Sequence, residues 1–183
     1  ALIAAVRARL GPVPMLYAGT GPNQSPKTPS LDLPGIAERH RAATTRALRA
    51  AGFTPASSRF YFHHPLTPPP ARLVFPLAET RPLTDPPGMQ LTLFETDGNP
   101  LATAILHKDT DDHWLLWNLT VRNDRRQHGI GSHLLTQCLH TAHTRGAASV
   151  IAHIDEDDHA SANLLNRSGF NYLDTLTIHH RRA

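Results

Sequence analysis

The stretch VRNDRRQHGIGSHLL, residues 121–135, combines residue types that could bind a phosphate group. An apolar run ends at Val121, a polar stretch follows, and Gly129 and Gly131 stand at the start of an amphipathic helical pattern. Glycine is a poor helix former, so two glycines here need a reason. One reason is that the N–H groups and the positive dipole end of a helix bind anions. Chance is the alternative, because about 0.7 Gly-x-Gly pairs are expected for this composition and residues 19–21 form another one.

Three kinds of glycine-rich phosphate loop compete for this stretch. A P-loop requires Gly-Lys-Ser/Thr, whereas Gly131 is followed by Ser-His. A dinucleotide-binding fold places its first glycine directly at the strand end and wants a third glycine where this chain has Leu134. The remaining pattern is Arg126-x-x-Gly129-x-Gly131 at the start of a helix, in which Arg126 adds positive charge.

Most other residues that could do chemistry are interpreted as structural. The 13 histidines show no Cys/His spacing typical of a metal site, so no metal is predicted, and His140 and His143 on one helix face are expected to be exposed. The only cysteine, Cys138, falls in register with apolar helix positions and is expected in the core. The acidic run 155–158 either begins a helix, where carboxylates favour the dipole, or serves catalysis.

The elements that position the glycine stretch alternate between strands and helices. Strands are predicted at 72–77, 90–95, 100–107 and 113–121, with Asp97-Gly98 as the hairpin turn between the middle two. A helix from Ile130 that ends at Gly146, a strand at 149–154, a helix at 160–168 that ends at Gly169 and a strand at 173–180 follow. Residues 72–183 can therefore form a complete α/β domain.

The first third of the chain repeats the end of this order. The pattern predicts a helix at 2–10, a strand at 13–18, a loop at 19–35, a helix at 36–51 that ends at Gly52, and a strand at 57–64. Helix, Gly-Phe, strand and His-His recur in both places, which suggests a duplicated unit, although all α/β proteins alternate such elements.

The predicted domains are a half-sized unit at 1–65, a Pro-rich linker at 66–71 and a complete domain at 72–183. The two strands of the half-sized unit would present open edges if they were left unpaired. We therefore expect them to pair with the C-terminal sheet or with the same segment of a second chain in a homodimer.

The composition excludes several classes of function. Hydrophobic residues make up 40% and charged residues 18% of 183 residues, which fits a folded chain with one ample core. The two lysines and 16 arginines are scattered and give a net charge of only +3, so no nucleic-acid partner is expected. No run has the length of a membrane span and the opening does not fit a signal peptide, so a cytoplasmic protein without membrane contact is predicted.

The pattern Arg126-x-x-Gly129-x-Gly131 resembles the pyrophosphate loop of the GNAT superfamily of acyl-coenzyme A N-acetyltransferases, which reads Gln/Arg-x-x-Gly-x-Gly/Ala. The segment IDEDDHASANLLNRSGF, 154–170, is similar to the family's second cofactor segment, and the resemblance covers residues 72–183. It implies an α/β fold with a mixed, mostly antiparallel sheet flanked by helices, preceded here by a half-sized related α/β unit. Tandem enzymes similar to mycothiol synthases have such an arrangement, and the ending GFNYLDTLTIHHRR resembles theirs.

The resemblance also implies acetyl-coenzyme A as the cofactor. The strand end at Leu119, Thr120 and Val121 would offer backbone groups to the pantetheine arm and the thioester. The loop would hold the pyrophosphate, and the start of the second helix would line the other side of the arm. The residues implied are Arg126, Gln127, His128, Gly129, Ile130, Gly131 and Ser132 in the loop, and Asp158, His159, Ser161 and Asn163 in the helix.

Several positions depart from the family pattern. Asp158 replaces the usual Asn, Leu165 replaces a Tyr that protonates the leaving thiolate in many members, and Leu115 replaces a strand Glu that some members use as general base. Residues 78–89 show no helical pattern, although the family usually has two helices there that form the acceptor wall. Binding of the cofactor is therefore better supported by the sequence than catalysis.

The predicted activity is the transfer of an acetyl group from acetyl-coenzyme A to a primary amine of a small molecule or peptide. The candidates for the general base, by position, are His113, His153, Asp155 and Glu156. The alternative is a non-catalytic acyl-coenzyme A-binding module, a degenerate transferase that acts as a sensor or binds a partner. The three substituted positions favour this alternative, and the phosphate loop is compatible with both.

Overall fold

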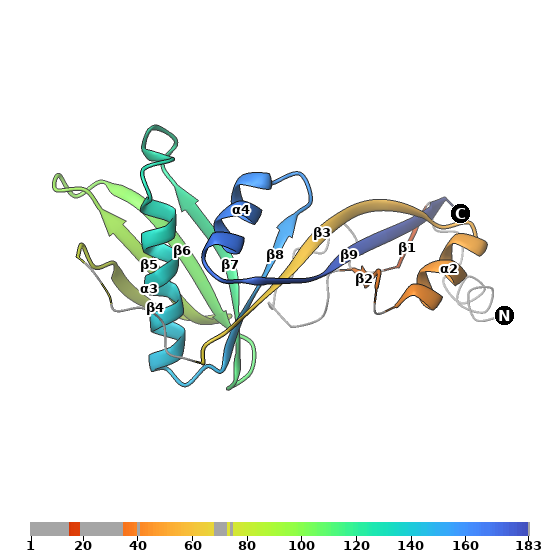
Figure 1. The fold of residues 1–183 in the computed structure, drawn as a ribbon, viewed down its shortest axis with the longest axis horizontal. Helices are drawn as coiled ribbons and strands as arrows, with labels where there is room; N and C mark the ends of the chain where they lie inside the picture. Colours follow the sequence, from red (N-terminus) through yellow and green to blue (C-terminus); the bar gives the residue numbers. More distant parts are fainter. Residues whose placement is uncertain (1–14, 19–34, 40, 68–72, 74, 183) are drawn as a thin grey trace.

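The computed structural model describes residues 15–18, 35–39, 41–67, 73 and 75–182 (Figure 1). The predicted helix at 2–10, the predicted loop up to residue 34 and the linker prolines at 68–70 lie outside these residues. In chain order the elements are β1 (Met15–Ala18), β2 (Ile36–Ala37), α2 (Ala42–Ala50), β3 (Thr54–Pro65), β4 (Glu79–Thr84), β5 (Pro87–Phe94), β6 (Pro100–Lys108), β7 (His113–Val121), the 3-10 turn η1 (Asn123–Arg125), α3 (Ile130–Thr144), β8 (Ser149–Asp155), α4 (His159–Arg167) and β9 (Asn171–Arg182).

The nine described strands form one sheet. Its order is β1-β9-β3-β8-β7-β6-β5-β4, and β2 pairs with β9 off this path. β7 and β8 are parallel, and the other pairs of neighbouring strands are antiparallel. The helices α3 and α4 lie side by side over the main part of the sheet (Figure 1). The mixed, mostly antiparallel sheet flanked by helices that the sequence predicts is therefore confirmed.

The main core lies between the sheet and these two helices. Strand alternation turns every second side chain of β5 and β6 toward the helices, and these positions are almost fully buried: Met89, Leu91, Leu93, Ala102, Ala104 and Leu106. From α3, positions at helical spacing join them: Leu134, Leu135, Cys138, Leu139 and Ala142. Cys138 has no exposed surface and burial raises the pKa of its thiol, so its predicted place in the core is confirmed.

Strand β3 lies between β8 and β9, inside the sheet. Residues Arg59 to Pro65 pair with β8, and Thr54 to His63 pair with β9. The expectation that the strands of residues 1–65 pair with the C-terminal sheet is therefore confirmed, and β1 does the same by pairing with the end of β9. A division of the chain at residue 65 does not coincide with a division of the sheet. The origin of residues 1–65 as a second copy of the domain stays a prediction.

The far part of the β3–β9 ribbon projects beyond the main sheet and carries α2, β1 and β2 (Figure 1). A small separate core lies there, formed by Leu48 and Phe53 with Ile36 and Ala51 packed against them. Helix α2 begins at Ala42, later than the predicted start at residue 36, because Ile36 and Ala37 pair with β9 instead. Gly35 approaches β9 so closely that a Cβ there would lie 2.8 Å from the carbonyl carbon of Thr177, which explains why the chain enters this ribbon through a glycine.

The hairpin predicted at Asp97-Gly98 is present. Glu95 N–H donates to the carbonyl of Asn99 at 2.9 Å, and Gly98 has a φ of 84°. The predicted ends of the helices are also confirmed, since α2, α3 and α4 end just before Gly52, Gly146 and Gly169.

The strand predicted at 72–77 is wrong in its described part, because the first strand of this region is β4 at Glu79–Thr84. The chain from Phe75 to Ala78 is held against α3 by a buried glutamine instead of by a strand. Gln137 Oε1 accepts from the N–H of Ala78 at 2.7 Å, and its Nε2 donates to the carbonyl of Pro76 at 3.0 Å. A proline has no N–H for a ladder, so hydrogen bonds from a helix side chain replace strand pairing here.

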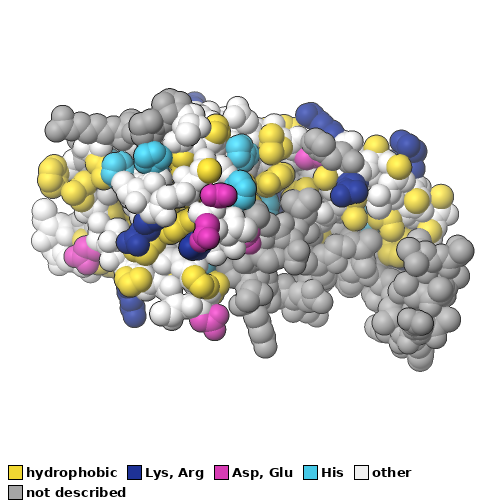
Figure 2. Space-filling view, turned by 90° about the horizontal axis from the view of Figure 1, so that it is seen from below, with side chains coloured by type: hydrophobic (Ala, Val, Ile, Leu, Met, Phe, Trp, Pro, Cys, Tyr) yellow, Lys and Arg dark blue, Asp and Glu magenta, His cyan; other side chains and the backbone are white. Residues whose placement is uncertain are grey.

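The surface has no single dominant charge on the face in Figure 2. Lys and Arg side chains occur there at separate places with acidic side chains between them (Figure 2). None of the helices in the described ranges is long and apolar enough to cross a membrane.

Four histidines are held in surroundings that disfavour their charged form. Burial lowers the pKa of His63, His64 and His107, and it lowers the pKa of His153 to about 4, with the charge of Arg59 adding to the effect. Repulsion between neighbouring imidazoles, from His113 and His64, adds to the lowering of the pKa of His63. In the folded protein these four side chains therefore stay neutral at a pH where an unfolded chain would begin to protonate them.

Removing residues 1–65 is expected to disrupt the fold, because β8 and β9 would lose the strand between them. A fragment of residues 66–183 should be poorly soluble or should melt without a cooperative transition in circular dichroism. In the full chain, Phe62→Ala on β3 (2% exposed) should lower the free energy of unfolding by about 3–5 kcal/mol. The control Phe94→Ala (37% exposed) should lower it by less than about 1 kcal/mol. A soluble fragment as stable as the full chain would contradict the structural role of β3.

The free energy of unfolding is expected to fall between pH 7 and pH 5. A histidine with a lowered pKa binds fewer protons when folded than when unfolded, so stability is lost as the pH drops below the ordinary value near 6.5 toward the folded value. For His153, with a folded pKa of about 4, the contribution over this interval is up to about 2 kcal/mol. In urea titrations, the free energy of unfolding of His153→Gln should fall less between pH 7 and pH 5 than that of the original protein. The control His159→Gln, at an exposed position, should keep the pH dependence of the original protein. An equal pH dependence of the unfolding free energy in both variants would refute the role of His153.

Candidate active site

The sheet opens between β7 and β8. The two parallel strands pair only from His113 to Leu116 on β7 and from Ser149 to Ala152 on β8, and they separate beyond these residues. A bulge in β7 accompanies the separation: Leu116 pairs with Leu106 and Asn118 pairs with Ile105, so Trp117 is an extra residue in the ladder. A bulge bends its strand and increases the local twist, which directs the end of β7 away from β8.

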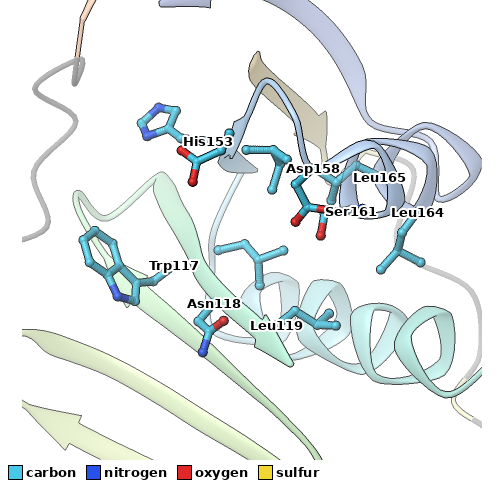
Figure 3. A pocket seen from close by; sticks show the side chains of 11 residues that line it. Trp117, Asn118, Leu119, His153, Asp158, Ser161, Leu164 and Leu165 are labelled. Atoms are coloured by element: carbon cyan, nitrogen blue, oxygen red, sulfur yellow. Dashed lines mark hydrogen bonds between the residues drawn. The ribbon is translucent and has the colours of Figure 1, made fainter. Parts of the chain in front are cut away.

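A pocket of about 230 Å³ occupies this opening, between β7, β8 and α4 (Figure 3). Its apolar lining consists of Leu116, Leu119, Ile154, Leu164 and Leu165. The other lining residues are Trp117, Asn118, His153, Asp155, Asp158 and Ser161. The spacing of Trp114 and Trp117 on one strand predicts that they point to opposite faces, and buried Trp114 agrees with this. Trp117 is not predicted as a site residue, because a bulge leaves no mark in the hydrophobic pattern of β7.

Helix α3 begins beside the pocket. Its N-cap is Gly129, whose φ of 78° favours glycine and which has no side chain to cap the helix. The first hydrogen bond inside the helix runs from His133 N–H to the Gly129 carbonyl, so the N–H groups of Ile130, Gly131 and Ser132 come before it. A Cβ at Gly131 would lie 3.4 Å from Leu164 Cδ2 and 3.7 Å from Leu119 Cδ2, which places the helix start directly against the apolar lining.

The three arginines of the loop before α3 have different partners. Arg122 lies 2.8 Å from Glu95 and 2.7 Å from Asp124, and Arg125 lies 2.9 Å from Glu95. Arg126 donates from Nε to the neutral carbonyl of Val121 at 3.2 Å, and it forms no ion pair with any of the described carboxylates. Arg126 is thus the arginine of this loop whose charge is available to an anion.

Asp158 caps helix α4. It accepts the N–H of Ser161 at 3.0 Å, which is the role of a helix N-cap. Burial alone would raise its pKa, but hydrogen bonds from Ser161 and Ala160 and the charge of Arg126 lower the pKa overall. Asp158 is therefore ionised, and it closes the pocket on the side of α4. This geometry supports the interpretation of the acidic run as a helix start.

Three of the predicted cofactor residues line the pocket, and the others do not. Leu119 and Ser161 line it together with Asp158, whereas the following are at the end of β7, in the loop, in the first turn of α3 or on exposed positions of α4: Thr120, Val121, Arg126, Gln127, His128, Gly129, Ile130, Gly131, Ser132, His159 and Asn163. His128 is bound locally, with its Nδ1 at 2.7 Å from the Arg126 carbonyl.

The four candidates for a general base fall into two groups. His113 is at the paired end of β7, where its Nδ1 lies 2.8 Å from Ser149 Oγ, and neither it nor Glu156 lines the pocket. Asp155 lines the pocket but forms an ion pair with Arg59 at 2.7 Å. His153 lines the pocket, and its Nε2 is buried without a hydrogen-bond partner among the described residues. His113 begins β7, whereas His153 lies near the end of β8, beyond the point where the two strands separate. The sequence does not show where the strands separate, so it predicts both histidines as candidates.

The two leucines at family-specific positions are both buried. Leu165, which the resemblance aligns with a proton donor of many family members, lines the pocket and is 2% exposed. Leu115 is also buried but lies outside the lining. His140 and His143, predicted to be exposed, are half-buried on α3, and no group of three or more metal-binding side chains is found within the described ranges.

Comparisons with known proteins agree with this arrangement. The model of the family described as "Acetyltransferase (GNAT) family" matches residues 54–170. A comparison with curated proteins gives no match.

Among solved structures, a GCN5-related N-acetyltransferase from Sphaerobacter thermophilus is similar with a TM-score of 0.64 and 16% identity, over 97% of this chain and 64% of that one. A tandem GNAT protein from the clavulanic acid biosynthesis pathway has a TM-score of 0.64 and 13% identity, over 92% and 64%. A GCN5-related N-acetyltransferase from Kribbella flavida has a TM-score of 0.62 and 14% identity, over 80% and 66%. This chain therefore spans just under two thirds of the length of the first two.

These identities establish a common fold and no more. The family match begins at β3 and ends after α4, so it includes the opening between β7 and β8, the glycine loop and the capped helix. Because this match covers more than half of the sequence, the chain belongs to the acetyltransferase (GNAT) family.

Proposed function

We propose that this protein transfers an acetyl group from acetyl-coenzyme A to a primary amine of a small molecule or peptide. The observation that carries the proposal is the meeting of three features at one pocket: the uncapped start of α3, the charge of Arg126 and the opening between β7 and β8. The start of α3 can hold an anion, and the opening between β7 and β8 can hold an extended apolar chain with amide groups. The residues present therefore fit an acyl-coenzyme A.

The N–H groups of Gly129 to Ser132 and the side chain of Arg126 would hold the diphosphate. The end of β7 from Leu119 to Val121 and the start of α4 at Asp158 and Ser161 would hold the pantetheine arm between them. The coenzyme supplies an acyl group activated as a thioester. Since no described strand pairs with this side of β7 after Leu116, its backbone groups there can bond to the arm in the manner of a strand.

The bulge in β7 supplies the group that polarises the carbonyl. Beyond Leu116 the backbone N–H groups that face the opening are released from pairing with β8. Such an N–H, at Trp117, Asn118 or Leu119, would stabilise the negative charge that develops on the carbonyl oxygen. In the reaction the C–N bond forms, the C–S bond breaks, and one proton leaves the amine while the thiolate gains one.

His153 is the residue that we assign as the proton acceptor. It lines the pocket, and burial keeps it neutral at physiological pH, the form that can accept a proton directly or through water. The same burial, with a pKa of about 4, makes it a weak base, so the proton it accepts must come from the acidic ammonium formed when the amine has attacked the carbonyl. Asp155 is less suited because Arg59 neutralises it. Leu165 cannot donate a proton, so water protonates the leaving thiolate.

A non-catalytic acyl-coenzyme A-binding module is the second candidate. The apolar side chains at Leu165 and Leu115 favour it, since neither can transfer a proton. Mass spectrometry of the protein with acetyl-coenzyme A and a panel of amines separates the two. Thiol release together with an acetylated amine establishes the enzyme, and coenzyme binding without either product establishes the module.

We also infer that residues 1–65 are the rear part of a second, related unit joined to the domain at 72–183. The similarity to a tandem GNAT protein over 92% of this chain supports this, together with the small core around Leu48 and Phe53. In this arrangement the unit at 1–65 contributes β3 to the sheet of the domain that follows, where it pairs with β8 and β9.

Gly129→Ala is expected to weaken coenzyme A binding about tenfold, because alanine at a φ of 78° strains the loop by about 1–2 kcal/mol and displaces its N–H groups. Gly98→Ala is the matched control: its φ is 84°, and a Cβ meets nothing within 4 Å at either glycine. Both variants should lose similar stability, but only Gly129→Ala should lose affinity in calorimetry. Unchanged affinity in a folded Gly129→Ala would refute the loop assignment.

Leu165→Tyr is expected to raise turnover by up to about 100-fold if the missing proton donor limits the rate. Leu165→Phe is the control, because it adds the same ring without the hydroxyl group and carries the same overpacking cost. The ratio of kcat for the two variants isolates the effect of the hydroxyl. A ratio near one would show that departure of the thiolate needs no acid from this position.

A further inference from the structure

Two aromatic pairs lie beside the opening between β7 and β8, on the face of the sheet turned away from α3 and α4. Trp117 contacts His107, which alternates with the core residue Leu106 on β6. His153 stands between Ala152 and Ile154, both of which pack toward the helices, so it projects to the opposite face. Figure 3 shows Trp117 and His153 on one side of the pocket and Leu119 and Leu164 on the other.

Trp117 is an exposed side chain on a fixed support. The residue is 44% exposed, and its ring centroid lies 5.7 Å from that of His107 at an interplanar angle of 73°. His107 is itself 6% exposed, and its Nδ1 is buried without a hydrogen-bond partner among the described residues, so packing in the sheet holds its ring. The indole therefore keeps its edge-on contact with His107, while its exposed surface is available to another molecule.

The second pair stands across the opening on β8 and β3. His153 lies 5.2 Å from the ring of Tyr61 at an interplanar angle of 49°. Burial lowers the pKa of both His107 and His153, so neither carries a positive charge at neutral pH. The charged groups beside the second pair are Arg59 and Asp155, which form an ion pair with each other. Buried Asp174 on β9 pairs with Tyr61 in the ladder and accepts the N–H of Arg39 at 3.0 Å. This side of the opening therefore presents aromatic surface whose neighbouring charged groups are ion-paired or hydrogen-bonded, which suits the flat apolar part of an amine acceptor.

We propose that the acceptor is an arylalkylamine, a primary amine on a short chain from an aromatic ring, and that its ring stacks on Trp117. The inference rests on the proposed function, and it adds the substrate class. Trp117 is part of the pocket lining, so a ring on its indole lies a short alkyl chain away from the opening where the amine must react. An indole face stacks on aromatic rings better than on saturated ones of the same size. Trp117 is thus a specificity-determining residue, and His107 is a positioning residue for it.

The test compares 2-phenylethylamine with 2-cyclohexylethylamine, which differ in the ring alone, and with spermidine as a polyamine. With the full chain and acetyl-coenzyme A we expect a KM for 2-phenylethylamine about tenfold lower than for the saturated amine. Trp117→Ala should remove this difference, raising the KM for 2-phenylethylamine at least tenfold, with the KM for acetyl-coenzyme A changed less than twofold. Trp117→Phe should keep most of the preference, and Phe94→Ala, an exposed aromatic residue near the far end of β5, should not alter it.

The positioning role of His107 has its own readout. His107→Ala should raise the KM for 2-phenylethylamine about threefold with kcat retained, and His107→Phe, which restores a ring beneath the indole, should recover it. Equal KM values for the two ring amines, a preference for spermidine, or an unchanged KM in Trp117→Ala would each overturn the proposal.

Failure of the proposed function is distinguishable from failure of this inference. If coenzyme A binds but no amine is acetylated, binding of 2-phenylethylamine to the coenzyme A complex is measured by ligand-observed NMR. Binding that is lost in Trp117→Ala and kept in Phe94→Ala supports the aromatic site even without catalysis. Absence of binding, or binding that Trp117→Ala leaves unchanged, overturns it.

Discussion

The short parallel contact between β7 and β8 is the constraint on which the candidate site depends. Parallel neighbours must be joined by a crossover, and α3 supplies it, so the start of this helix is brought back to the end of β7. Because pairing stops after Leu116 and Ala152, the strand ends diverge and α4 covers the gap from one side. The pocket, the helix start and the unpaired backbone therefore arise from one feature of the sheet.

The two faces of the sheet contribute different kinds of side chain to the opening. Toward α3 and α4, alternating apolar residues of β5 to β8 form a dry core that fixes the helix start and the apolar lining. Toward the other face, the bulge turns Trp117 outward, and His107 and His153 flank the same gap. In the proposed reaction, a donor held on one face would meet an acceptor that arrives from the other. Strand β3 supports this geometry, since it pairs with β8 and keeps that strand from being a free edge.

Electrostatics assign different tasks to side chains that look equivalent in the sequence. Arg122 and Arg125 hold Glu95 and so tie the glycine loop to the β5–β6 hairpin, whereas Arg126 bonds to a neutral carbonyl and retains its charge for an anion. Asp155 forms an ion pair with Arg59, and Asp158 is the N-cap of α4, where it accepts the N–H of Ser161. The partners of Asp155 and Asp158, and not the fact that both are carboxylates, decide what each of them can do.

Local sequence determined the elements whose signals are short-range: the helix ends at Gly52, Gly146 and Gly169, the hairpin at Asp97-Gly98, the buried stripe of α3 and the glycine loop at its start. Tertiary structure alone decided the rest. The insertion of β3 between β8 and β9, the exact partner of each arginine and the bulge at Trp117 depend on residues far apart in the chain, whose proximity has no periodic or compositional signature. For the same reason His113 and His153 looked alike as bases, although only the point at which β7 and β8 separate decides which of them reaches the pocket.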